Sequence, residues 1–195
     1  RDEYLSGNVV EKLKIAQKNA EEDPAFLNNV EQLEKVQPPP IAAIDIYSPM
    51  HARWIPQHHI YEFLQDLLKT NDIDLNFSRS SDTYSVNIFD RSGSVAAFAS
   101  KRKSADWVIN HALNGIEPKV TYVVEAEQGK MKLEFDAEDT QLAKENYRKI
   151  KGAWDDWKYN DYNRREHLAG IYNKTFNNTV LRSYDGSHMT FPGLI

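Results

Sequence analysis

Three side chains that could bind a divalent metal ion lie within one turn of a predicted helix. His58 and His59 are followed by Glu62, and His51 stands just upstream. Imidazole and carboxylate groups three or four residues apart on a helix can share one metal ion. No second helix offers a matching pair, so the sequence favours ordinary surface or half-buried histidines, and we predict no metal and no cofactor. A small enzyme that uses His58, His59 and Glu62 stays open as an alternative hypothesis.

The phosphate-binding and methyl-transfer motifs of nucleotide-using enzymes are absent from the sequence. It contains neither G-x-x-x-x-G-K-[ST] nor G-x-G-x-x-G, the glycine-rich turns that hold phosphates at a helix start. The Asp/Asn/Ser-Pro-Pro-aromatic turn with which amino-methylating DNA methylases hold a flipped base is also missing, because Gln37–Pro40 supplies only the prolines. Ser100 and Lys103 match the S-x-x-K pattern of penicillin-recognising enzymes, but the companion K-T-G is absent. We therefore expect no catalytic residue in this chain.

Clustered cations are the candidates for contact with nucleic acid. Lys101, Arg102 and Lys103 are consecutive and stand just before a predicted helix, and Arg164 and Arg165 form a second group. Phosphate contacts need cations on an exposed loop or helix end, so these five are the predicted DNA-contact residues. The net charge of -5 and the lack of a basic tail restrict any such surface to a local patch.

Two tryptophans are the candidates for docking on a protein partner. Trp154 and Trp157 are three residues apart in a predicted helix, which places them on one face. Such aromatic side chains can also stack on bases. The spacing is more typical of a core or of a docking face, and we assign these two residues to docking.

The composition predicts a folded protein that neither enters a membrane nor leaves the cytoplasm. Hydrophobic residues make up 41% of the chain and charged residues 27%, as in ordinary globular proteins. No stretch approaches the 18 or more consecutive apolar residues of a membrane helix, and the first twenty residues have no apolar run of signal-peptide type. The absence of cysteine excludes disulfide frameworks and thiolate metal sites. We expect a cytoplasmic location.

Hydrophobic periodicity predicts an α+β fold with about four antiparallel strands in two hairpins and about five helices. A helical hairpin over residues 1–36, with Asn8 and Asp23 as N-caps, is expected to be an appendage. The stiff connector Pro38–Pro40 separates it from an α+β domain over residues 41–195. The first elements expected there are an extended segment over 41–46, a helix after Pro56, and strands over 73–77 and 84–88. A helix over 104–113 should follow, and then strands over 119–125 and 131–135 around Gln128-Gly129. The last elements expected are a helix capped by Asp136, a helix over 163–175, and a loop or extended tail over 177–195.

Several segments across nearly the whole chain carry a resemblance to a known family. The matching segments in the amino-terminal half are 2–9, 11–13, the stretch from 29–31 to 36–38, and 54–56. Those in the carboxy-terminal half are 164–166 and the stretch that runs from 172–173 over 176–177 to Tyr184–Gly193. They resemble very large fusion proteins of phages, plasmids and integrative elements, in which an N6-adenine DNA methylase region is followed by an SNF2-like helicase. The run Tyr184–Gly193 is the most specific match. The chain also begins with Arg1 and lacks a polar, tapering end, so we expect a segment of a longer protein.

The resemblance implies a place between the methylase and helicase halves, just ahead of the ATP-binding motifs of the helicase. It implies an intact protein that is an ATP-dependent DNA helicase and DNA methyltransferase, whose catalytic motifs lie outside this chain. The implied partners are the neighbouring methylase and helicase domains and duplex DNA. The leading hypothesis is therefore a non-catalytic connector or DNA-positioning domain. The alternative is a protein-protein docking module without DNA contact, which would use the 1–36 hairpin and the helix of Trp154 and Trp157.

Overall fold

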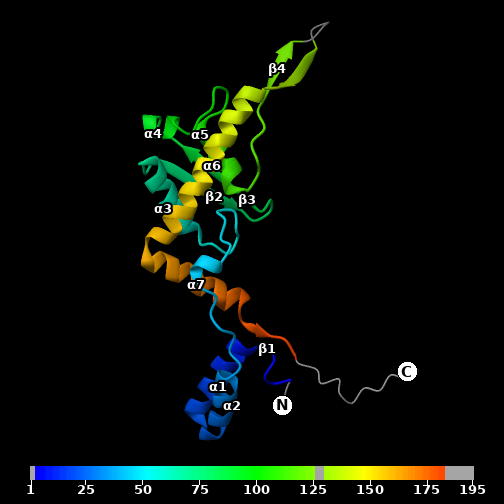
Figure 1. The fold of residues 1–195 in the computed structure, drawn as a ribbon, viewed down its shortest axis with the longest axis vertical. Coiled ribbons are helices and arrows are strands. Elements are labelled where there is room, and N and C mark those ends of the chain that lie inside the picture. Colours follow the sequence, from blue (N-terminus) through cyan, green and yellow to red (C-terminus); the bar gives the residue numbers. More distant parts are fainter. Residues whose placement is uncertain (1–2, 126–129, 183–195) are drawn as a thin grey trace, which may run out of the picture. The chain divides into compact units, whose positions relative to one another are not determined.

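The computed structural model describes residues 3–125 and 130–182, which form two compact units (Figure 1). Unit 1 combines residues 1–46 with residues 166–195, and unit 2 comprises residues 47–165. Helices and antiparallel strand pairs occur together, so the predicted α+β class is confirmed. The described residues hold seven α-helices and six strands, more than the predicted numbers. The expected boundary at the proline connector lies close to the first division, but the sequence pattern gives no sign of the second.

Unit 1 is built on the predicted helical hairpin. Both predicted N-caps are confirmed: the side chain of Asn8 accepts a hydrogen bond from the Glu11 amide at 3.0 Å, and that of Asp23 accepts one from the Ala25 amide at 2.9 Å. The elements that lie in this unit are β1 (Gly7–Asn8), α1 (Val9–Glu22), the 3-10 helix η1 (Pro24–Phe26), α2 (Leu27–Glu34), the 3-10 helix η2 (Ala43–Asp45) and β6 (Thr179–Val180). The expectation of an extended segment over 41–46 is wrong, because η2 occupies its centre.

A small core and a pair of amide side chains hold unit 1 together. Val9, Ala16 and Leu33 are buried between the two helices of the hairpin. Strands β1 and β6 pair in antiparallel fashion, although each is only two residues long. Proline has no amide hydrogen to donate, so the connector is bound mainly through its carbonyls. The Asn177 side chain donates to the Pro39 carbonyl at 2.8 Å, and Asn173 exchanges two hydrogen bonds with the backbone of Ile41.

Unit 2 contains the predicted helices and hairpins and one short helix that the sequence pattern does not indicate, α4. Its elements are α3 (Gln57–Leu68), β2 (Ile73–Ser78), β3 (Thr83–Ile88), α4 (Gly93–Ala96), α5 (Ala105–Leu113), β4 (Thr121–Glu125), β5 (Met131–Phe135) and α6 (Ala137–Asn160), and α7 (Tyr162–Phe176) begins in this unit and continues into unit 1. The predicted turn at Gln128-Gly129 and the family-like run Tyr184–Gly193 lie outside the described residues.

The two hairpins of unit 2 remain separate two-stranded sheets. Among the described residues, no further strand pairs with β3 because its outer edge is covered by side-chain amides of α5 and of its C-cap residue. Asn110 exchanges two hydrogen bonds with the backbone of Val86, at 2.8 and 3.0 Å, and Asn114 does the same with Tyr84, at 2.8 and 2.9 Å. These amides take the place of a neighbouring strand and close the edge to further pairing.

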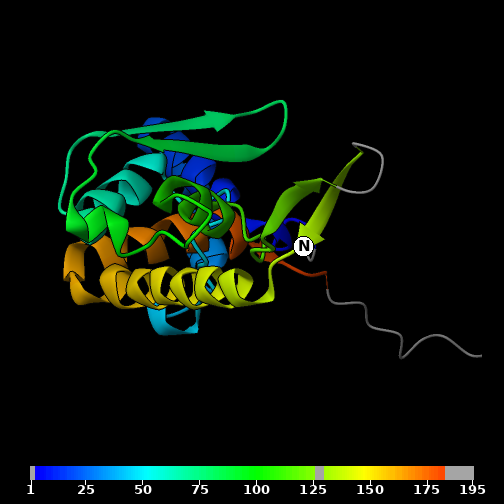
Figure 2. The ribbon, with the colours of Figure 1, turned by 90° about the horizontal axis from the view of Figure 1, so that it is seen from above.

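Helix α6 forms one side of unit 2. Figure 2 shows α3 and α5 between the β2-β3 hairpin and α6. The buried residues of α6 recur with helical spacing at Ala143, Tyr147, Ile150 and Trp154, so one stripe of the helix faces this interior. The opposite side of α6 is thereby left for solvent and for partners.

Candidate nucleic-acid interface

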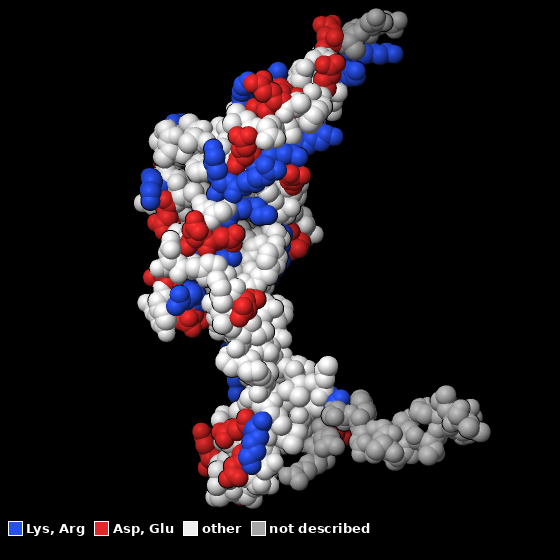
Figure 3. Space-filling view, viewed as in Figure 1, with Lys and Arg blue, Asp and Glu red and all other residues white. Residues whose placement is uncertain are grey.

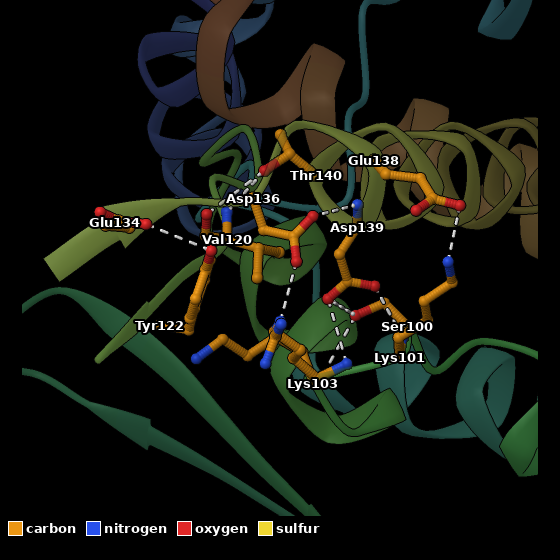
Figure 4. A network of polar contacts seen from close by, with 11 residues as sticks. Ser100, Lys101, Lys103, Val120, Tyr122, Glu134, Asp136, Glu138, Asp139 and Thr140 are labelled. Carbon is orange, nitrogen blue, oxygen red and sulfur yellow. Dashed lines mark hydrogen bonds and ion pairs between the residues drawn. The ribbon is translucent and has the colours of Figure 1, made fainter. Parts of the chain in front are cut away.

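The predicted Lys101–Lys103 loop is bound to the amino end of α6 (Figure 4). The anchor is Asp139, whose side chain is fully buried. Its carboxylate accepts hydrogen bonds from the Ser100 hydroxyl at 2.9 Å and from the amides of Lys101 and Arg102 at 2.7 and 3.1 Å. A buried carboxylate is stable only with such donors. The loop is therefore part of the structure that holds α6 in place.

Two side chains of this loop turn toward the acidic residues at the start of α6, whereas Lys103 Nζ lies 5.3 Å from the centroid of the Trp107 ring. Lys101 Nζ lies 2.6 Å from Glu138 Oε1, and Arg102 Nε lies 2.8 Å from Asp136 Oδ2. The pKa of Asp136 is lowered, first by the hydrogen bond from the Asp139 amide and then by Arg102. Both cations of these pairs are exposed, as is Glu138, whereas Asp136 is half-buried. An ion pair with an exposed cation stabilises the protein little, and the cation can exchange its partner for another anion. Contact of Lys101, Arg102 and Lys103 with DNA stays a prediction.

The second predicted group, Arg164 and Arg165, lies in the first turn of α7 and is half-buried. The Arg164 guanidinium stacks on the Trp157 ring, 3.2 Å from its centroid, and donates to the Trp157 carbonyl at 2.8 Å. Arg165 lies 5.3 Å from the centroid of the Tyr162 ring. Cation-π stacking of this kind orders a guanidinium but leaves its charge in place. A DNA contact of these two residues also stays a prediction.

A different basic surface lies along one flank of α6, beside its buried stripe. It consists of Lys144, Arg148 and Lys151, whose spacing of four and then three residues places them on one side of the helix, and we call it the α6 basic face. Figure 3 shows Lys and Arg side chains gathered over the part of unit 2 where Figure 1 draws α6. The sequence-based prediction relied on consecutive cations and missed these three, whose signal is their helical spacing.

Two of these three cations are available for a ligand. Lys144 Nζ lies 3.3 Å from Glu117 Oε1, whereas Arg148 and Lys151 form no ion pair with any residue in 3–125 or 130–182. Lys151 Nζ lies 5.3 Å from the centroid of the Tyr147 ring. Glu117, Tyr147, Arg148 and Lys151 line an open depression of about 370 Å³. Cationic and aromatic groups thus meet at one place on the surface.

His51 lies close enough to this face for the charge of Lys151 to affect its pKa. Its pKa is lowered by partial burial first, and then by the positive charges of Lys151 and Arg53. The loop at Gly115 packs against the imidazole so closely that a Cβ atom there would lie 2.9 Å from His51 Nδ1. Gly115 also has a φ of +68°, which other residues rarely adopt. Burial is thus the main cause of the lowered pKa, and the charge of Lys151 adds to it.

Comparison with known proteins identifies a family for this part of the chain. A family model described as a domain of unknown function, DUF8437, matches residues 49–178. The chain belongs to the DUF8437 family. No curated protein and no solved structure matches the chain. The matched residues of the DUF8437 domain include both the Lys101–Lys103 loop and the α6 basic face. Among its described helices, none is long and apolar enough to cross a membrane.

The predicted docking tryptophans of the DUF8437 domain differ in their surroundings. Trp154 is only 1% exposed, packs edge-on against Phe63 and donates from Nε1 to the Ser48 carbonyl at 2.8 Å. The structure places it in the core of unit 2, where a partner cannot reach its ring. Trp157 is half-buried, with Nε1 at 2.6 Å from Asp66 Oδ2 and the Arg164 guanidinium over its ring. Of the two, only Trp157 reaches the surface.

The candidate metal ligands of the DUF8437 domain lie together on the first turns of α3. His59 is buried, and its Nδ1 lies 3.3 Å from Glu62 Oε2. The ring of His58 lies 4.1 Å from that of His59, measured between centroids. The contact between His59 and Glu62 is an ordinary hydrogen bond between residues three apart on a helix. The enzyme hypothesis that uses these residues stays an alternative.

Proposed function

We propose that this DUF8437 domain is a non-catalytic connector that positions duplex DNA in a methylase/helicase fusion protein, with the α6 basic face as its phosphate contact. One observation carries the proposal: Arg148 and Lys151 line the same depression as Tyr147. Neither cation has an acidic partner among the described residues. Arginine and lysine side chains at a surface are the usual contacts to phosphate oxygens, and such contacts position a protein on DNA without reading its sequence.

The geometry of the face suits a phosphate backbone. Lys144 and Lys151 are seven residues apart, which is about 10 Å along a helix axis. That length covers about three base-pair steps of a DNA duplex. Phosphate contacts carry no sequence information, so we expect binding that depends strongly on salt and weakly on sequence. In a chain whose net charge is -5, these three cations make the α6 basic face a local cluster of positive charge.

The wider context of this proposal is the resemblance to methylase/helicase fusion proteins. The segments 54–56, 164–166 and 172–177, which carry part of that resemblance, lie within the residues that the DUF8437 model matches. A connector between two DNA-acting enzymes encounters DNA in its normal work. A basic face on its longest helix would hold the duplex in line with the neighbouring domains. No reaction is proposed for this chain.

Fluorescence anisotropy tests the DNA contact, with a labelled duplex of about 20 base pairs titrated over a range of salt concentrations. We expect the double variant Arg148→Glu/Lys151→Glu to bind at least about tenfold more weakly at low salt, with a salt slope smaller by about 0.9 for each phosphate that it no longer neutralises. The matched control is Lys18→Glu/Lys35→Glu, which makes the same change in net charge on exposed residues of unit 1, one in α1 and one directly after α2.

The proposal fails if the wild-type chain does not bind duplex DNA at low salt, or if both double variants bind equally weakly. Equal weakening would show that net charge alone governs binding. A chain that keeps its fold and binds no DNA would favour the alternative of a docking module. That alternative can no longer use Trp154, because the side chain belongs to the core.

A further inference from the structure

Three histidines come together at the amino ends of α3 and α7, and we call them the histidine cluster. His58 and His59 lie in the first turn of α3, and His167 lies in the second turn of α7. Each offers one ring nitrogen, and these three atoms all lie within 4.8 Å of one another. The first turn of α7 belongs to unit 2, as α3 does, and α7 is one continuous helix through His167. The position of His167 in the cluster therefore follows from that first turn.

The spacing of the three nitrogen atoms suits one metal ion after a small movement of side chains. Nitrogen ligands lie about 2.0 to 2.1 Å from a zinc ion, so two of them in a tetrahedral site are about 3.4 Å apart. Atoms that are at most 4.8 Å apart have to approach by no more than about 1.4 Å. His58 and His167 are exposed and can turn their rings, whereas His59 is buried. The buried histidine thus provides a fixed ligand, and the two exposed ones give access from solvent.

A carboxylate orients the buried histidine. His59 Nδ1 lies 3.3 Å from Glu62 Oε2, and an ionised carboxylate can only accept a hydrogen bond, so Nδ1 is the donor. The lone pair of the neutral ring is then on Nε2. Histidines that bind a metal ion commonly donate their other N–H to a carboxylate in this way. The Trp157 ring packs edge-on to the same imidazole, with 6.5 Å between the centroids, and restricts it further.

We propose that His58, His59 and His167 bind one divalent transition-metal ion, with Glu62 as the positioning residue of His59. The class of ion follows from the ligands, because imidazole suits zinc, copper and nickel, whereas magnesium and calcium need oxygen ligands. Three nitrogen ligands leave one position of a tetrahedral zinc ion for water or another ligand. This proposal departs from the sequence-based prediction of no metal. That prediction required a matching pair on a second helix, and the third ligand here is a single histidine far along the chain.

A bound ion would link the start of α7 to the first turn of α3. Because the unfolded chain does not hold the three histidines together, metal binding favours the folded chain. We therefore expect zinc to raise the thermal midpoint of the wild-type chain and to have a smaller effect on His167→Gln. No reaction is proposed at this site. The inference does not depend on the proposed DNA contact, because the histidine cluster and the α6 basic face share no residue.

Isothermal titration calorimetry with zinc chloride tests the site, on the 195-residue chain after EDTA has removed any bound metal. We expect one ion per chain. His167→Gln should weaken binding by more than about tenfold, because even the loss of a group that only orients a ligand costs about tenfold to hundredfold. The matched control is His111→Gln on α5, outside the cluster, which should bind zinc like the wild type. A wild-type chain that binds no zinc, or a His167→Gln chain that binds it equally tightly, overturns the proposal.

NMR of the imidazole nitrogens identifies the ligands. Zinc should shift the ring-nitrogen signals of His58, His59 and His167 and leave those of His111 unchanged. Shifts at His111 without shifts in the cluster would show an adventitious ion only and would overturn the site. Glu62→Gln keeps a hydrogen-bond acceptor but loses the charge, so zinc affinity should fall about tenfold. An unchanged affinity of Glu62→Gln overturns the positioning role of Glu62.

Discussion

Two basic clusters of unit 2 differ in what their charges already contact. The Lys101–Lys103 loop is a consecutive run, but its amides bind Asp139 and two of its side chains pair with Asp136 and Glu138. The α6 basic face is spread over eight residues of sequence, and only one of its three cations is paired among the described residues. Acidic residues are favourable at a helix amino terminus, so a basic loop that packs there is neutralised. Adjacent cations in a sequence are therefore a poor measure of a surface available to phosphate.

Removal of the anchor of the loop should give the largest effect. Asp139→Ala leaves the Ser100 hydroxyl and two backbone amides without their acceptor, and we expect a decrease of about 2 to 3 kcal/mol in the free energy of unfolding. Arg148→Ala, which removes an exposed cation from the other cluster, should change it by less than about 0.5 kcal/mol. Urea denaturation measures both. A small effect of Asp139→Ala would contradict the structural role of the loop.

Charge reversal in the loop should affect DNA affinity less than reversal on α6. Lys101→Glu/Arg102→Glu removes two cations whose charge is already offset by Glu138 and Asp136, so we expect affinity to fall about twofold to threefold, mainly from the change in net charge. The same anisotropy titration measures it beside Arg148→Glu/Lys151→Glu. If the loop variant binds more weakly than the α6 variant, the ranking of the two clusters is reversed and the loop is the main DNA contact.

The pKa of His51 should respond to the α6 basic face. Burial lowers this pKa first, and Lys151 and Arg53 lower it further, so Lys151→Gln should raise it toward 6.5. Because the folded pKa lies below the unfolded value, the unfolded chain binds more protons as the pH falls through 6.5, and folding stability decreases there. Lys151→Gln should make that decrease shallower. NMR titration of the imidazole measures the pKa, and an unchanged value in Lys151→Gln would remove the support that His51 gives to a positive face.

The smallest effect should come from the exposed ion pair of the loop. Glu138→Gln removes the charge that Lys101 contacts, but both side chains are exposed, and such pairs contribute little. We expect no measurable shift of the thermal midpoint. Differential scanning calorimetry checks this, and a clear destabilisation would show that the side-chain pairs, as well as Asp139, hold the loop on α6.

The parts of the fold that depend on local rules could be predicted from the sequence. Asn8, Asp23 and Asp136 are N-caps because a short polar side chain reaches a free amide two or three residues ahead, and the sequence alone shows that spacing. The two hairpins of unit 2 follow from alternation of apolar and polar residues. The β1-β6 pair could not be predicted, because two residues carry no period and the strands lie far apart in the chain.

The candidate site was harder to predict, because charge availability is a tertiary property. The partners of Lys101 and Arg102 lie more than thirty residues further along the chain, as does Asp139. The burial of Trp154 likewise depends on Ser48 and Phe63, which precede it by many residues. The spacing of Lys144, Arg148 and Lys151 was present in the sequence, but its meaning required knowing which side of the helix is buried.

NMR mapping of duplex DNA onto the isotope-labelled chain tests the central claim most directly. Addition of a short duplex at low salt should shift the amide signals of residues 144–151 and the imidazole signals of His51, and raise the pKa of His51 as phosphate offsets the charge of Lys151. The amides of Lys101 and Arg102, bound to Asp139, should shift little. Shifts confined to Lys101–Lys103 and Arg164-Arg165, or no shifts at all, would contradict a DNA contact through the α6 basic face.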